Sequence, residues 1–345
     1  MNFILDNKID IISSTPKEFD HSVGYHDIKP FNIKDDGHLL IHRYPQNTIG
    51  PKENLSIDLY IWDHKKGFFE KIDETTAWSW EQGSRLQWLD ENRIIYNKEI
   101  DNKFVSCVYN KNNMEKLIFS NPIYSIKKDK FLTLNYSRLW NQWKNYGYFS
   151  NSITQNNFEN DEIDENDEND GIFLCDFKGN KKLILSINDA IKICSLKNIK
   201  KKFFLAHPTF NPSGNKFVSI LRFFNDSGTL ISFLICTNLE TLEHKLLARE
   251  KVSHFEWLND HKLVVWCRKS SKKIELLRFN KFTEKYIISN VKKVINNLNP
   301  SLKQKITSTH YYVIDLNNNN QVKILDKDIL TEDGHPQIST NKNFL

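Results

Sequence analysis

The sequence predicts an all-β protein, namely a β-propeller of four-stranded antiparallel blades, six or seven in number, with an incomplete last blade. Two observations support this fold class. Short β-branched and aromatic runs alternate with polar turns along most of the 345 residues. A unit of about 40 to 50 residues that contains four such runs also recurs along the chain, which is the pattern of propeller blades.

The predicted strands are short, apolar and bounded by polar residues. They are Leu39–Tyr44, Leu59–Trp62, Arg93–Asn97, Phe104–Tyr109, Phe131–Tyr136, Ile172–Asp176, Phe217–Phe223, Leu230–Cys236, Leu263–Cys267, Ile274–Phe279 and Tyr311–Leu316. Only Ser186–Lys202 has helical spacing, because Ile187, Ala190, Ile191 and Cys194 fall on one face. Strands therefore dominate the predicted fold.

The repeat is clearest in three copies, which open at Leu86, Pro208 and Phe255. In the copy from Phe255, the second and third strands are predicted at Lys262–Arg268 and Lys273–Asn280, which are neighbours in sequence. Weaker copies open near Asp36-Gly37 and Lys127–Lys130, and a last one opens at His335-Pro336. That last copy stops at Leu345, so we expect either that the N-terminal segment closes the ring or, in preference, that the sequence is part of a longer one.

The whole chain, residues 1–345, is predicted to be a single propeller domain with one insertion at residues 137–170. The insertion is first aromatic and then acidic, since Glu159–Asp170 carries eight acidic residues and no basic one. Eight like charges cannot be desolvated without partners. We therefore expect the acidic run to be exposed and mobile, and the insertion to be partly disordered.

Composition excludes several classes of protein. The net charge of +5 is spread thinly over lysine-rich turns, with no nucleic-acid-binding module, so no nucleic-acid partner is expected. The first residues lack a secretory signal, and no stretch approaches the roughly 20 apolar residues that span a membrane. The five cysteines are scattered along the sequence, and no two of them are closely spaced. This predicts reduced core residues and a cytoplasmic location.

Aligning the copies places histidines at one position of the repeat. His207 lies three residues before Phe210, His254 three before Trp257 and His335 three before Ile338, and the copy from Leu86 has Arg85 at this position. Each precedes an innermost strand, and innermost strands line the central channel of a propeller. The side chains are therefore expected to converge, where three imidazoles could bind a divalent metal or share a proton and an anion.

An equally weighted alternative is that these histidines only shape the entry into a strand. Pro208 and Pro336 directly follow two of them, and proline is accepted at the first residue of a strand. His254 has no proline after it, which favours a functional role. Arg222 and Arg138 are candidate binders of an acidic ligand or, alternatively, solvated arginines at strand ends. Gln82 is an orienting group or a turn cap, and Arg85 is expected on the same rim.

An aromatic stripe lies beside Arg138 and Lys144. Its members are Trp140, Trp143, Tyr146, Tyr148 and Phe149. Flat rings can bury the apolar face of a sugar, and they can equally pack the insertion onto the domain. The sequence contains none of the GxSxG, phosphate-loop, HExxH or GxGxxG motifs, so hydrolase and nucleotide-binding functions lack support.

Several segments resemble the TolB-like and oligogalacturonate-lyase-like propellers. They are EQGSRLQWLDENRIIYN from Glu81, NYSRLWNQWKNYGY from Asn135, AHPTFNPSGNKFVSILRF from Ala206, VSHFEWL from Val252 and EDGHP from Glu332. This resemblance implies a propeller that acts on uronic-acid chains by β-elimination with a manganese site of histidines and a glutamine. It carries over His254 and His335 as pocket histidines, and His207 joins them by its position in the repeat. The family's QxxHxH ligand cluster is absent from this sequence.

The sequence therefore supports two hypotheses. The first is a carbohydrate-directed propeller, a lyase of acidic oligosaccharides in which His254 takes the proton and Arg222, or manganese near His335, stabilises the enolate. The second is a non-catalytic propeller that binds a protein or a glycan.

Overall fold

The computed structural model describes residues 14–32, 34, 37–52, 55–149, 168–197, 199–249, 251–268, 309–318, 321–325, 330 and 332–337. The chain divides into two compact units. The first unit is Met1–Pro122 with Trp143–Gln155, and the second is Ile123–Gln142 with Asn156–Leu345. The prediction of one domain over residues 1–345 stays a prediction.

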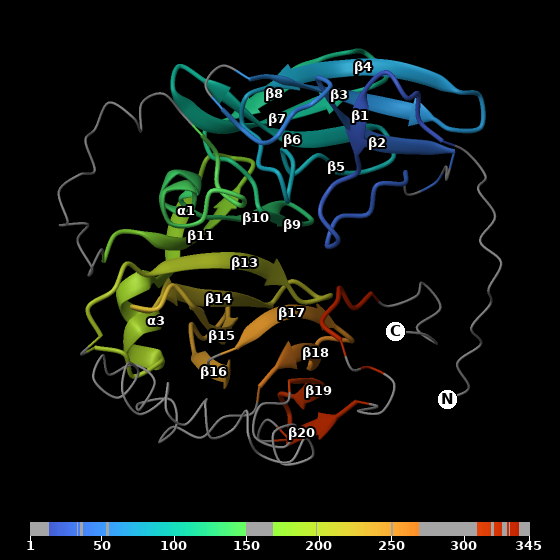
Figure 1. The fold of residues 1–345 in the computed structure, drawn as a ribbon. Coiled ribbons are helices and arrows are strands. Elements are labelled where there is room, and N and C mark those ends of the chain that lie inside the picture. The colour runs from blue at the N-terminus through green and yellow to red at the C-terminus, as the bar shows by residue number, and fades with distance from the viewer. Residues whose placement is uncertain are drawn as a thin grey trace. The chain divides into compact units, whose positions relative to one another are not determined.

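The described residues of the first unit form two four-stranded antiparallel sheets, each with its strands in chain order (Figure 1). One sheet consists of β1 (Asp20–Ser22), β2 (His38–Tyr44), β3 (Ile57–Asp63) and β4 (Phe68–Thr75). The other consists of β5 (Gln87–Trp88), β6 (Arg93–Ile100), β7 (Lys103–Asn110) and β8 (Lys116–Phe119).

The part of the second unit that the structure describes forms three such sheets. The first has β9 (Ser125–Lys127), β10 (Lys130–Thr133), β11 (Gly171–Asp176) and β12 (Lys181–Ser186). The second has β13 (Phe204–Phe210), β14 (Lys216–Phe224), β15 (Leu230–Asn238) and β16 (His244–Ala248). The third has β17 (Val252–Trp257), β18 (Lys262–Cys267), β19 (His310–Asp315) and β20 (Gln321–Ile324). The described residues of this unit also form two helices, α1 (Tyr136–Gln142) and α3 (Ile187–Ile193).

The predicted fold class, an all-β propeller of four-stranded antiparallel blades, is confirmed. Among the described residues there are five consecutive blades, and each is an antiparallel meander of four strands. The last predicted copy, from His335, falls mostly outside the described residues.

Apolar faces of neighbouring blades pack together and form the core. In the second unit, Val218 and Leu234 of one blade share a buried cluster with Val265 and Ile314 of the next. Central strands such as β14 are buried along most of their length, since both of their faces are covered. The predicted strands Phe217–Phe223 and Leu263–Cys267 accordingly lie inside β14 and β18.

Three predicted elements differ from the structure in their pairing or their bounds. The strand paired with β18 is β19, so the blade from Phe255 takes its third strand from His310–Asp315 and not from Lys273–Asn280, which lies outside the described residues. Both edges of β18 are occupied, by β17 and β19. Sequence neighbours usually pair, and this blade is an exception to that tendency.

The other two errors concern helices. The helix predicted over Ser186–Lys202 is only α3, which begins after the cap residue Ser186, whose hydroxyl accepts from the Asp189 N–H. It ends where Ser195 adopts a left-handed backbone with φ of 62°. The predicted strand Phe131–Tyr136 stops at Thr133, and α1 begins at Tyr136.

Most of the acidic run, and its predicted mobility, lies outside the described residues. Its last member, Asp170, is buried and ion-paired with Arg138, so the prediction of exposure is wrong for this residue. All five cysteines are buried and none of them is in a disulfide, as predicted. In the described part of the chain, no helix has the length and apolar character needed to cross a membrane.

Candidate acid–base site

The inner strand β17 has a bulge at the predicted site residue His254. Its pairing with β18 passes from Val252 directly to Phe255, which leaves Ser253 and His254 outside the regular ladder. Bulges change the direction in which a side chain points and often lie beside functional sites. The bulge thus separates His254 from the strand pairing and lets it meet residues from elsewhere in the chain.

Asp333 is the partner of this histidine. His254 Nδ1 lies 2.8 Å from Asp333 Oδ1. The Ser253 hydroxyl donates to the same carboxylate, at 2.9 Å from Oδ1 and 2.7 Å from Oδ2. The side chain of His254 is 20% exposed and that of Asp333 is 38% exposed, so the pair is accessible from solvent. We call Ser253, His254, Asp333 and His335 the β17 cluster.

The contact with Asp333 determines how His254 can act. A carboxylate only accepts hydrogen bonds, so Nδ1 carries a proton and Nε2 has the lone pair of a neutral ring. Burial raises the pKa of Asp333, but hydrogen bonds from His254 and Ser253 and the charges of His254 and Lys251 outweigh it and lower the pKa. The carboxylate is therefore ionised at neutral pH and supports proton transfer at His254 Nε2.

His335 lies against this pair. Its ring centroid is 4.1 Å from that of His254, with the rings in an edge-to-face arrangement. The Tyr311 hydroxyl donates to the Gly334 carbonyl at 2.7 Å and so fixes the backbone beside His335. Burial, and then the charge that His254 carries when it is protonated, lower the pKa of His335, while Asp333 opposes the shift. His335 is therefore neutral at neutral pH.

His207 lies in an equivalent bulge of the preceding blade but has different surroundings. The pairing of β13 with β14 passes from Ala206 to Thr209, and His207 itself has a left-handed φ of 53°. Its ring is buried, with Nδ1 at 2.9 Å from the Tyr124 hydroxyl and Nε2 at 3.0 Å from Arg222 Nη1.

Arg222 is a buried structural group in this arrangement. It is 3% exposed, and besides His207 it donates to the Ser232 hydroxyl at 3.3 Å and to the Val252 carbonyl at 3.5 Å. Val252 is the residue at which the β17 bulge begins. Arg222 thus connects the two bulges through a buried hydrogen-bond network, and it does not present its guanidinium to solvent.

The three predicted metal ligands do not fit a manganese ion. Among the described residues, which include all three histidines, no group of His, Cys, Asp or Glu side chains is placed to hold a metal. Arg222 donates to His207 Nε2, so a cation there would have to displace a positive charge. The structure brings His254 and His335 together, and His207 lies with Arg222. The expected convergence of three histidines is therefore corrected.

The remaining polar candidates are buried or form ion pairs within the protein. Arg85, in the first unit, is 1% exposed and forms a bidentate ion pair with Asp27, at 3.0 and 2.8 Å. Gln82 is completely buried in the same loop. In the second unit, Arg138 pairs with Asp170, which also accepts from Asn135. These contacts hold the loops in place.

The aromatic stripe is divided between packing and surface. Tyr148 is fully buried, where its hydroxyl accepts from the Asn97 amide at 2.9 Å. Trp143 and Tyr146 are only partly buried, and their ring centroids are 4.0 Å apart. Trp140 lies in α1 and is also partly buried. Packing therefore accounts for Tyr148, and sugar stacking by Trp143 and Tyr146 stays a prediction.

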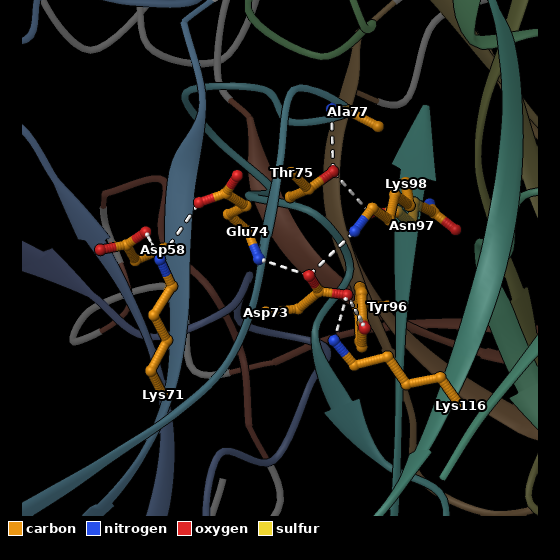
Figure 2. Close-up of polar contacts among 10 residues, drawn as sticks. All are labelled: Asp58, Lys71, Asp73, Glu74, Thr75, Ala77, Tyr96, Asn97, Lys98 and Lys116. Carbon is orange, nitrogen blue, oxygen red and sulfur yellow. Dashed lines mark hydrogen bonds and ion pairs between the residues drawn. The ribbon is translucent and has the colours of Figure 1, made fainter. Parts of the chain in front are cut away.

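Sequence reasoning missed a charged cluster around Asp73 in the first unit (Figure 2). The buried carboxylate of Asp73 accepts from Lys98 Nζ at 2.8 Å, from Lys116 Nζ at 3.0 Å and from the Tyr96 hydroxyl. Burial raises the pKa of Asp73, but these contacts outweigh it and lower the pKa to about 2. The cluster links β4 to the next blade, and no sequence motif marks it.

Comparison with known proteins finds similarity of structure only. No protein-family model matches the chain, and no curated protein sequence matches it. TolB from Acinetobacter baumannii aligns at 12% identity and a TM-score of 0.38, over 73% of this chain and 50% of that one, so the chain spans half the length of TolB.

Two further solved structures are similar at the same level. An oligogalacturonate lyase in complex with manganese aligns at 13% identity and a TM-score of 0.38, over 90% of this chain and 79% of that one. The β-propeller domain of the Trilobed protease from Pyrococcus furiosus aligns at 8% identity and a TM-score of 0.39, over 92% of this chain and 73% of that one. The solved structures that are similar to this chain thus include a TolB and an oligogalacturonate lyase, the two kinds of propeller that the sequence resembles.

Proposed function

We propose that the β17 cluster is a general-base site that splits acidic, uronate-containing oligosaccharides by β-elimination. The observation that carries the proposal is the 2.8 Å contact between His254 Nδ1 and Asp333 Oδ1. A carboxylate that fixes one ring nitrogen of a histidine leaves the other as a base of defined direction. The uronate class of substrate comes from the sequence resemblance.

In the proposed step, His254 Nε2 takes the proton from the carbon next to the uronate carboxylate. The electron pair of that C–H bond becomes the new carbon–carbon double bond, and the bond to the leaving glycosidic oxygen breaks. Water supplies a proton to the leaving oxygen. Asp333 stabilises the imidazolium that forms on His254, as an ionised carboxylate does in other acid–base pairs. The step is complete without a metal, which agrees with the poor fit of the three histidines to manganese.

The negative charge of the substrate needs a cation at the site. Arg222 is buried beneath the bulge, so we do not retain it in this role. Lys251 is exposed, and its charge acts on Asp333. We therefore assign the attraction of the uronate carboxylate to Lys251.

A reducing compartment is part of the proposal. Five buried free cysteines support a cytoplasmic location, because such thiols persist where disulfides do not form.

The test is an absorbance assay for the unsaturated product, with mixed uronic oligosaccharides as substrates. His254→Ala should lower the rate by at least about a hundredfold, the usual effect of removing a general base. His261→Ala is the matched control, since His261 is an exposed histidine beside β18 of the same blade. Reactions with added manganese and with chelator should have equal rates. No product from the wild-type chain under any of these conditions would reject the lyase function.

The alternative is a non-catalytic propeller that binds a glycan or a protein. The partly buried pair Trp143 and Tyr146 favours the glycan version, because two adjacent rings can stack on a sugar. Titration calorimetry with the same oligosaccharides would detect heat of binding without turnover. Trp143→Ala would then abolish binding, and His254→Ala would leave it unchanged.

A further inference from the structure

The outer strand β8 of the second blade presents unusual apolar surface at the edge of its sheet. It is the last strand in the sheet order and pairs with β7 alone among the described strands. In β8, Leu117 is 60% exposed and Ile118 is 59% exposed, whereas Met114, at 71%, lies in the preceding turn and outside the strand. An open edge offers unpaired backbone groups to another strand, and apolar side chains there add affinity.

The usual protections of an edge strand are missing from β8. The outer strands β4, β12 and β16 belong to blades whose outer pairing is interrupted by a bulge or register shift, whereas the pairing of β7 with β8 is regular. Strand β4 also carries several charged side chains. β8 has only Lys116, and Figure 2 shows that this side chain reaches Asp73, at 3.0 Å. The charge that could protect the edge is therefore directed into the protein.

The hydrogen-bond alternation shows which backbone groups of β8 lie at the open edge. The Asn110 N–H donates to the Glu115 carbonyl, so these two residues form a hydrogen-bonded pair. In an antiparallel ladder such pairs alternate, and Leu117 and Phe119 therefore direct their backbone groups toward β7. Lys116 and Ile118 direct theirs outward. Ile118 is the central outward residue of the exposed apolar run.

We propose that β8 is a dimerisation edge, to which β8 of a second copy adds as an antiparallel strand with Ile118 opposite Ile118 of the partner subunit. This register pairs Leu117 with Phe119 and Lys116 with Ser120 across the two-fold axis. All of the apolar residues then meet apolar residues, and no like charges are opposed. The sequence of the strand is thus self-complementary, which selects a second copy as the occupant.

The experiment is sedimentation velocity of the full chain over a range of concentrations. The short interface predicts a reversible dimer, with roughly micromolar affinity. Ile118→Lys places two positive charges directly opposite each other and should weaken the dimer by about tenfold or more. Ile118→Glu should do the same with negative charges. An equimolar mixture of the two variants should restore the dimer, because opposite charges then meet.

The control is Met114→Ser, which removes the most exposed of these apolar side chains but leaves the strand intact, and its dimerisation should be unchanged. Circular dichroism establishes that each variant is folded. A wild-type chain that stays monomeric at all concentrations would overturn the proposal. So would a mixture of the charged variants that stays monomeric, or a Met114→Ser variant that loses the dimer as Ile118→Lys does.

Discussion

The bulges at His207 and His254 occupy the same position in consecutive blades, yet the two side chains have different surroundings. His207 is buried, and a tyrosine and an arginine occupy both of its ring nitrogens. His254 is partly exposed, and an ionised carboxylate fixes one ring nitrogen. The repeat therefore determines where a histidine is placed, while residues from other parts of the chain determine whether it can exchange protons with a ligand.

The largest expected effect is on stability, at the buried histidine. His207→Ala removes the acceptor of Arg222 Nη1 and the partner of the Tyr124 hydroxyl inside the protein. We expect the free energy of unfolding to fall by about 2 to 4 kcal/mol. Urea unfolding of His254→Ala should show a change below about 1 kcal/mol. Equal losses of unfolding free energy in the two variants would contradict the difference in burial and contacts between the two histidines.

His42 extends the comparison to a buried histidine of the first unit. Its ring is completely buried, accepts from the Ser84 N–H at 3.1 Å, and has a pKa that burial lowers to about 4. The unfolded chain binds a proton near pH 6.5, so stability is complete above that pH and falls as the pH drops toward 4. The expected loss is about 3 kcal/mol.

The measurement is urea unfolding at a series of pH values in this window. A His42→Gln variant should be less stable at neutral pH and should show a flatter dependence on pH. If the slope of the wild type persists unchanged in His42→Gln, other groups cause the loss.

The sequence predicts well those elements that local apolar patterns determine, and predicts poorly those that depend on partners distant in the chain. Strands β14 and β15 are predicted nearly to their bounds, because apolar runs covered on both faces have few alternatives. Helix α1 was missed, since its tyrosine, leucine and tryptophan also suit a strand. The third strand of the last blade was misplaced because its partner is distant in sequence.

The site shows the same division. The position of His254 and His335 in the repeat predicted that they belong together, and their rings are in contact. Asp333 lies two residues before His335 in the EDGHP segment, so the same sequence motif that predicts His335 also contains its acidic neighbour. Tyr124, which binds His207, has no motif around it. Its role depends on packing between blades, which a single sequence does not encode in any local pattern.

Asp333→Asn tests whether the carboxylate matters for chemistry more than for folding. The pair is accessible to solvent, so unfolding free energy should change by less than about 1 kcal/mol. The elimination rate should fall by at least about tenfold, because the amide does not stabilise an imidazolium. A variant with the wild-type rate would remove Asp333 from the proposed site.

The smallest effect is a pair of opposite pKa changes at His335. The positive charge of His254 lowers its pKa and Asp333 raises it. His254→Gln should therefore raise the pKa of His335, and Asp333→Asn should lower it further. Proton NMR titration of the imidazole signals measures both. Shifts in the same direction would contradict the arrangement of these three side chains.

The central claim, that Asp333 holds His254 as a base, is tested most directly by the nitrogen NMR signals of the His254 ring. In the wild-type chain, at a pH where the ring is neutral, we predict the tautomer with the proton on Nδ1 and none on Nε2. Asp333→Asn should reduce this preference. A wild-type ring that carries its proton on Nε2 would contradict the account, because the nitrogen assigned to take the substrate proton would then already hold one.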